Sequence, residues 1–143
     1  MFMGTTYNSI DEKNRMIVPS KLRAGLGARC ILTKGLDRCL YIYTTEDWEK
    51  QMEKIARLPE SDPHVRAFIR HFCANAAECE FDKQGRIGIP QELKNYAGIE
   101  KELVTMGAMS KIEIWARDVW EAPNNENKME AEDFAKALAA YNF

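Results

Sequence analysis

Residues 11–23 read DEKNRMIVPSKLR, and residues 82–94, which begin 71 positions later, read DKQGRIGIPQELK. Both stretches share one frame, Asp-x3-Arg-x3-Pro-x2-Leu followed by a basic residue. After a one-residue shift the likeness continues in four equivalent pairs: Thr33 with Thr105, Gly35 with Gly107, Ile42 with Ile114, and Trp48 with Trp120. A repeated frame with a matching continuation indicates an internal duplication. We therefore interpret the chain as two copies of one unit, over residues 8–49 and 79–121.

Each copy predicts the same order of elements: a short strand, a turn at proline, a short helix and a hairpin. The strand is an apolar run that ends at Pro19 or Pro90, because proline cannot continue a central ladder. Runs rich in β-branched and aromatic residues then predict two strands joined by a short loop. The predicted helices cover residues 20–25 and 91–96, and the predicted hairpin strands cover residues 29–33 with 39–43 and 102–105 with 111–115. Because a unit this small buries little apolar surface alone, we expect the copies to share one core across a pseudo-twofold axis.

Helical patterns fill the rest of the chain. Residues 45–58 predict one amphipathic helix behind a Thr44 or Thr45 cap, and a second helix begins near Asp62. The second helix places an apolar stripe at helical spacing, which we interpret as a core face: Val65, Phe68, Ile69, Phe72, Cys73 and Ala76. A last short helix is predicted over residues 129–138, in an acidic region that we interpret as a solvated face.

These patterns divide the chain into four parts. They are a first repeat at residues 1–50, a helical insert at 51–78, a second repeat at 79–121 and an acidic C-terminal helical tail at 122–143.

Charge and hydropathy exclude several classes of protein. Twenty Lys and Arg against 22 Asp and Glu give the 143 residues a net charge of −2, which excludes a uniformly basic protein that coats any polyanion. Only a local basic patch is left to bind nucleic acid. No apolar run approaches the ~18 residues that a membrane span needs, and residues 1–8 lack the pattern of a secretory signal. We expect a cytoplasmic protein without a membrane partner.

The sequence lacks the common signatures of an enzyme. It has no phosphate-binding glycine loop, no dinucleotide fingerprint and no nucleophile elbow. The four cysteines form no Cys-x-x-Cys pair, so we interpret them as reduced, small apolar residues rather than metal ligands. We interpret His64 and His71, seven residues apart on one predicted helix, as surface residues. We therefore expect no catalysis, no cofactor, no metal and no small-molecule substrate.

The two Asp-x3-Arg loops are the candidate site. Lys13 and Arg15 lie in the first loop, and Lys83 and Arg86 lie in the second. Arginine's planar fork can bind a phosphate or a guanine edge, and an acidic neighbour can hold it in one rotamer. A second interpretation is that each Arg only pairs with its Asp to fix the turn, while the lysines are solvated. The residues alone favour neither. A third, in which the two Asp form a catalytic carboxylate pair, is weaker because each has a basic residue four positions on.

The doubled frame resembles the Asp-x-Lys-Gly-Arg-x3-Pro signature of the bacterial MraZ family, and residues 3–11 resemble that family's start. The likeness covers essentially the whole chain, and the family is similar in turn to AbrB-like and SpoVT-like transcription factors. The resemblance implies an α+β fold, a pseudo-twofold double-split β-barrel built from two swapped-hairpin repeats with flanking helices. It also implies a homo-oligomeric ring of about eight subunits.

The function that the resemblance implies is transcriptional regulation at the nucleoid, by sequence-specific binding to double-stranded DNA. The DNA sites would be direct repeats upstream of the division and cell wall gene cluster. Matched position by position, the DNA-binding residues fall on Lys13, Arg15, Lys83 and Arg86, and the loop-supporting residues fall on Asp11, Asn14, Asp82 and Gly85.

Two positions depart from the family pattern. Asn14 stands where the family usually has glycine, although asparagine also tolerates a left-handed turn. Gln84 stands where the first loop has Lys13, so we expect the second loop to bind DNA more weakly.

An alternative function is a protein-interaction scaffold or antitoxin-like module that uses the 65–76 stripe and the acidic tail. Two copies and a helical insert disfavour that alternative.

Overall fold

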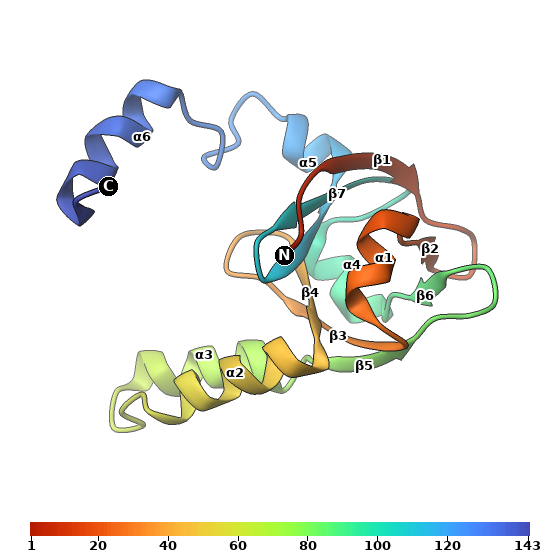
Figure 1. Cartoon of the computed structure of the whole chain (residues 1–143), viewed down its shortest axis with the longest axis horizontal. Coiled ribbons are helices and arrows are strands. Elements are labelled where there is room, and N and C mark those ends of the chain that lie inside the picture. The colour runs from red at the N-terminus through yellow and green to blue at the C-terminus, as the bar shows by residue number, and fades with distance from the viewer.

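A six-stranded antiparallel sheet in the order β1-β7-β8-β4-β3-β5 forms the centre of the computed structural model, which describes residues 1–143 (Figure 1). A separate two-stranded ribbon pairs β2 with β6. The strands are β1 (Thr5–Ser9), β2 (Arg15–Ile17), β3 (Arg29–Lys34), β4 (Leu40–Thr44), β5 (Ala77–Glu80), β6 (Arg86–Gly88), β7 (Glu102–Ala108) and β8 (Lys111–Ala116). The helices are α1 (Ser20–Leu26), α2 (Thr45–Ala56), α3 (Pro63–Cys73), α4 (Gln91–Ala97), α5 (Arg117–Glu121) and α6 (Ala131–Leu138), followed by a 3-10 turn, η1 (Ala139–Tyr141).

The two repeats exchange strands. β1, at the start of the first repeat, pairs with β7 of the second repeat, whereas β5 pairs with β3 of the first repeat. The ribbon again takes one strand from each repeat, in a register that is symmetric under the 71-residue shift: Arg15 with Gly88, Met16 with Ile87, and Ile17 with Arg86. The first and third pairs are therefore the same pair seen from the two repeats. This register agrees with the expected pseudo-twofold axis.

The sheet separates two apolar clusters. The larger one has 20 buried residues and lies between one sheet face, the ribbon and helices α1 and α4. The smaller one has seven buried residues and joins the other face to the hairpin of α2 and α3. Strand β4 shows why both clusters form, since Leu40 and Ile42 enter the first and Tyr41 and Tyr43 the second. The predicted α+β class is confirmed, but the ladders form an open sheet with a separate ribbon, so the double-split barrel stays a prediction.

The insert helices begin where the sequence predicts. The Thr44 hydroxyl accepts a hydrogen bond from the Asp47 amide at 2.9 Å, and Asp62 accepts one from the His64 amide at 2.8 Å. The end of α3 differs from the prediction, because Ala76 lies beyond the helix. The Asn75 side chain donates a hydrogen bond to the carbonyl of His71 at 3.1 Å and so gives a partner to one carbonyl of the last helical turn.

Three further expectations need correction or completion. Strands β1 and β5 were not predicted. The sequence of β1, TTYNS, has no apolar alternation, and β5 falls at the end of the predicted helical insert. His71 is half-buried rather than a surface residue, since its Nε2 lies 2.8 Å from the Gly35 carbonyl and its ring packs edge-on against Tyr96. His64 is exposed. Helix α6 begins at Ala131, two residues later than predicted.

Three of the four cysteines are buried apolar residues of the strands and their turn, and all four are free thiols. Cys30 faces Cys79 in the ladder between β3 and β5. A hydrogen bond with Cys79, together with burial, raises the pKa of the Cys30 thiol, and burial raises the pKa of Cys39. These thiols are therefore protonated at neutral pH.

None of the helices is long and apolar enough to cross a membrane.

Candidate nucleic-acid interface

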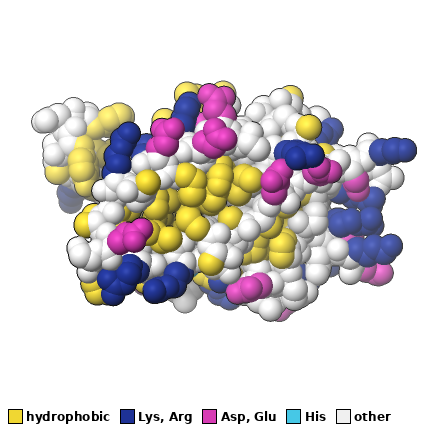
Figure 2. All heavy atoms as spheres, turned by 90° about the horizontal axis from the view of Figure 1, so that it is seen from below, with side chains coloured by type: hydrophobic (Ala, Val, Ile, Leu, Met, Phe, Trp, Pro, Cys, Tyr) yellow, Lys and Arg dark blue, Asp and Glu magenta, His cyan; other side chains and the backbone are white.

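The two Asp-x3-Arg loops lie side by side at one end of the molecule. One joins β1 to β2 and the other joins β5 to β6, and both lie at the right of Figure 1. Lys and Arg side chains gather at the same end in the space-filling view (Figure 2). Arg86 Nη1 lies 3.7 Å from Asp11 Oδ2 and so joins the second loop to the first. The pseudo-twofold ribbon therefore brings together the loops that the sequence separates by 71 residues.

Each loop is built around its aspartate. Asp11 Oδ1 accepts hydrogen bonds from the amides of Lys13 at 2.9 Å and Arg15 at 2.8 Å, and its Oδ2 accepts one from Arg15 Nε at 2.9 Å. The second loop repeats this geometry, with Asp82 bound to the Gln84 and Arg86 amides and to Arg86 Nε. The predicted pairing of each Arg with its Asp is confirmed in both loops.

These donors set the protonation state of the two aspartates. Hydrogen bonds from the backbone amide of Arg15 hold the pKa of Asp11 below its usual value of 3.8, and those of Arg86 do the same for Asp82. Both carboxylates are therefore ionised at neutral pH and already occupied as acceptors. Such groups cannot act as general acids near pH 7, which argues against a catalytic carboxylate pair.

Acid should weaken the fold through the same two groups. Because each pKa is lower in the folded chain than in the unfolded chain, their stabilisation is complete above the usual value of 3.8 and is lost as the pH falls through the lowered pKa. We expect the double variant Asp11→Asn and Asp82→Asn to lose less thermal stability than the wild type between about pH 5 and pH 2.5. Melting temperatures followed by circular dichroism over that range check this, and parallel profiles would contradict it.

A left-handed corner follows each aspartate, and each corner contacts the other repeat. Asn14 has a φ of 59° and Gly85 a φ of 75°. The Asn14 side chain accepts a hydrogen bond from Lys94 Nζ at 3.0 Å and donates one to Gln91 Oε1 at 3.1 Å, so the first loop rests on α4. The Asn14 side chain thus makes contacts that a glycine could not make.

The second corner rests on α1 instead. Gly85 is buried beneath the guanidinium group of Arg23, which a Cβ at Gly85 would overlap. Arg23 Nη1 in turn donates to the Val18 carbonyl at 2.9 Å. Backbone hydrogen bonds complete both corners, from the Ile89 amide to the Asn14 carbonyl at 2.7 Å and from the Val18 amide to the Gly85 carbonyl at 3.2 Å.

Gly85 is therefore a sensitive position. We expect Gly85→Ala to lower the free energy of unfolding by about 1–3 kcal/mol, because the new side chain must occupy a left-handed conformation and displace Arg23. Gly88→Ala is the matched control, because Gly88 lies in a strand and a methyl group added there would have no neighbour within 4 Å. Urea denaturation should separate the two variants, and equal losses would contradict the strain at Gly85.

The four basic residues of the candidate site differ in their exposure and in how many of their hydrogen-bond donors lack an acceptor within the chain. Lys13 and Lys83 are exposed. Arg15 uses its Nε for Asp11, and its two terminal NH2 groups have no acceptor within the chain. Arg86 lies between Asp82 and Asp11, and its side chain is 24% exposed against 33% for Arg15. Arg15 therefore has the greater donor capacity for a ligand.

The charge of this end contrasts with the rest of the chain. Residues 11–23 and 82–94 contain seven Lys and Arg and four Asp and Glu, which leaves a net charge of +3. Since the whole chain has −2, all other residues together carry −5. The small net charge is thus an average over a basic end and an acidic remainder.

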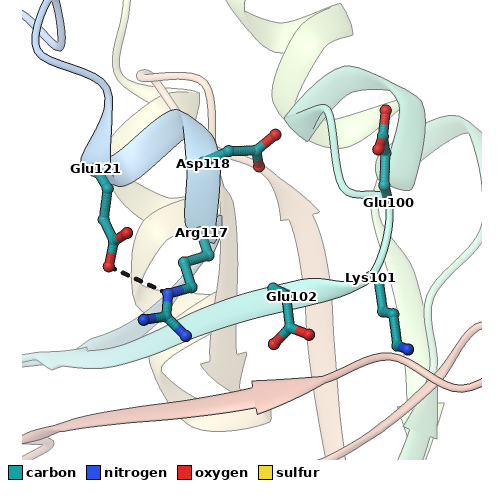
Figure 3. A pocket seen from close by; sticks show the side chains of 6 residues that line it. All are labelled: Glu100, Lys101, Glu102, Arg117, Asp118 and Glu121. Carbon is teal, nitrogen blue, oxygen red and sulfur yellow. Dashed lines mark hydrogen bonds and ion pairs between the residues drawn. The ribbon is translucent and has the colours of Figure 1, made fainter.

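A pocket that is lined mostly by carboxylates lies between α5 and the start of β7 (Figure 3). Its six lining residues include no apolar side chain: Glu100, Lys101, Glu102, Arg117, Asp118 and Glu121. Arg117 Nε donates to Glu121 Oε1 at 3.1 Å, as the dashed line in Figure 3 marks. Four carboxylates against two cations disfavour a polyanion here, so the basic end is the better candidate for a nucleic-acid interface.

Sequence reasoning missed the residues that brace the loops from the other repeat: Arg23, Gln91 and Lys94. A signal for two of them was present, because Arg23 and Lys94 are the equivalent basic residues that end the two frames. Their partners, however, lie 62 to 80 positions away and are set by the ribbon's register.

The family model and the curated relatives that match this chain all carry the same family name. A family model described as "MraZ protein, putative antitoxin-like" matches residues 1–71 and again residues 72–140. The chain is 48% identical over 139 residues to the transcriptional regulator MraZ of Acetivibrio thermocellus, covering 97% of each chain. It is 44% identical over 142 residues to the protein of the same name from Thermoanaerobacter pseudethanolicus, covering 99% of each. The corresponding protein of Clostridium tetani is 50% identical over 127 residues, or 89% of each chain.

Proposed function

This chain belongs to the MraZ family of transcriptional regulators, and from that premise we propose that it binds double-stranded DNA through its two Asp-x3-Arg loops. The DNA sites would be direct repeats upstream of the division and cell wall gene cluster. The observation that carries the proposal is the pairing of the two loops at one basic end, where Arg15 keeps free donors. An Arg with unoccupied NH2 groups can bind the O6 and N7 atoms of guanine or a phosphate.

The braced loops suit this role because they are formed before DNA arrives. Asp11 and Asp82 fix the rotamers of Arg15 and Arg86, so little side-chain freedom is lost on binding. Lys13 and Lys83 would contact phosphates without reading the bases. With Gln84 in place of a lysine and Arg86 between two carboxylates, the second loop would contribute less affinity than the first.

A protomer with only four candidate DNA-binding residues needs several copies to bind tightly. We propose a homo-oligomeric ring of about eight subunits that presents its loops to successive repeats, so that binding at one repeat raises the effective concentration at the next. Closure of the fold into a double-split barrel, and residence at the nucleoid, belong to the same proposal. The ribbon shared between the repeats supports the barrel, because it places a strand of each repeat beside the other.

Size-exclusion chromatography with light scattering tests the ring and the ligand together. Without DNA, the mass should be about eight times the 16.4 kDa of the protomer. With a duplex that carries the promoter repeats of its own genome, the complex should elute earlier, whereas a duplex of shuffled sequence should bind only at low salt. A protein that binds both duplexes alike at physiological salt would contradict sequence-specific recognition.

A further inference from the structure

Helix α6 has an apolar face with no partner in its own chain. Every residue from 126 to 143 is exposed, and the helix projects away from the body in Figure 1. Phe134, Leu138 and Tyr141 follow one another at i, i+4 and i+7 and form one stripe, and these residues are 48%, 38% and 78% exposed. Exposed stripes of this kind mark interaction surfaces.

The segment that precedes α6 is anchored at Trp120, so α6 begins near α5. Asn125 Nδ2 donates to the Trp120 carbonyl at 2.9 Å, and Lys128 Nζ lies 5.4 Å from the centroid of the Trp120 ring. Only Met129 and Glu130 separate this turn from α6, and two residues span at most about 7 Å. Figure 1 shows α6 well separated from the α2 and α3 hairpin of the same chain.

The α3 side of that hairpin offers a complementary surface, whereas α2 carries the carboxylates Glu46, Asp47, Glu49 and Glu53. Figure 2 shows an apolar band across the face of the molecule that holds α2 and α3. The apolar residues of the hairpin that keep exposed area include Leu58, which is exposed, and the half-buried Met52, Val65, Phe68 and Ile69, of which Met52, Phe68 and Ile69 also pack against the smaller cluster. Helix α3 also carries Arg66 and Arg70 and no carboxylate. The stripe on α6 is flanked by carboxylates instead, from Glu130 and Asp133.

We propose that α6 of one subunit docks through Phe134, Leu138 and Tyr141 on the outer face of the α2 and α3 hairpin of a second copy. Glu130 and Asp133 would then lie near Arg66 and Arg70 of the second copy. This inference rests on the proposed homo-oligomer and names the segment that joins its subunits. Because the two surfaces differ, the contact is head to tail, and a head-to-tail contact closes into a ring when its rotation allows.

A matched pair of variants on α6 tests the docking. Phe134→Ser with Leu138→Ser removes the stripe, and Glu132→Ser with Lys136→Ser makes the same two changes on the opposite face without altering the net charge. The control pair loses at least as much helix propensity as the stripe pair, because Phe and Ser have similar propensities whereas Leu, Glu and Lys exceed Ser. In sedimentation velocity, we expect the stripe variant to associate at least about tenfold more weakly and the control to associate like the wild type. Equal association of all three proteins would overturn the proposal.

Cross-linking identifies the surface that α6 contacts. With p-benzoylphenylalanine at position 134 of the full chain, irradiation should join two chains, with the attachment within residues 52–70. Attachment within one chain only, or to a different surface of the second copy, would overturn the docking but leave the ring standing. A wild-type protein that sediments as a monomer would overturn both the docking and the ring, while DNA binding is measured separately.

Discussion

Arg15→Ala should weaken binding to a duplex with several promoter repeats by more than about 100-fold while leaving the fold and the subunit association unchanged. Arg15 is the site arginine whose terminal NH2 groups have no acceptor in the chain. Loss of one arginine contact costs about 1–3 kcal/mol per engaged loop, and the losses multiply when several subunits engage one duplex. The fold should survive, because the Asp11 carboxylate still accepts the two backbone amides of its turn.

Fluorescence anisotropy with labelled duplex measures this effect, and circular dichroism and light scattering check the fold and the mass. Arg38→Ala is the matched control, because it removes the same charge from an exposed position in the turn between β3 and β4, away from both loops and from the hairpin of α2 and α3. The dependence of affinity on salt should become shallower for Arg15→Ala only. If both variants bound the repeats equally well, the loops would not be the DNA-reading surface.

Trp115→Ala should cause the largest loss of stability, about 3–5 kcal/mol in the free energy of unfolding. Trp115 is 1% exposed and belongs to the smaller cluster, which has only seven buried residues. Its ring lies 5.0 Å from that of Trp120, and its Nε1 donates to Glu113 Oε1 at 2.9 Å. The cavity would therefore open where the sheet, α5 and the tail meet.

Urea denaturation followed by far-ultraviolet circular dichroism, at one fixed protomer concentration, measures the loss. The concentration is fixed because association itself adds to stability. Leu36→Ala serves as the control, since Leu36 is 69% exposed in a hairpin turn and should change the free energy by less than about 0.5 kcal/mol. A Trp115→Ala loss no larger than that of the control would mean that the smaller cluster does not support the fold.

The sequence predicted those parts of the fold in which local pattern and burial agree. The frame from Asp11 to Arg23 predicts a strand, a turn at Pro19 and a short helix, and the structure has β2 and α1 there. Helix α2 follows its predicted cap at Thr44. The edge strands escaped prediction because their stabilising partners are remote, and polar residues such as Asn8 suffice on a half-exposed edge.

The candidate site was predictable in its parts but not in its assembly. Each aspartate and its arginine are four residues apart, so spacing alone suggested their pairing. The contact of Arg86 with Asp11, and that of Lys94 with Asn14, join residues 75 and 80 positions apart. Such contacts depend on the register of the ribbon, which follows from the packing of the whole core. Their DNA-binding role stays a prediction.

The exchange of strands between the repeats also constrains how the chain is made. Thr5 pairs with Met106, about a hundred residues later, so β1 has no partner while the ribosome is still adding the second repeat. The nascent first repeat holds its hairpin of β3 and β4 with neither β5 nor β8 beside it. Non-local pairing of this kind slows folding. A message truncated before β7 would therefore yield a chain in which β1 and β4 lack their partners β7 and β8.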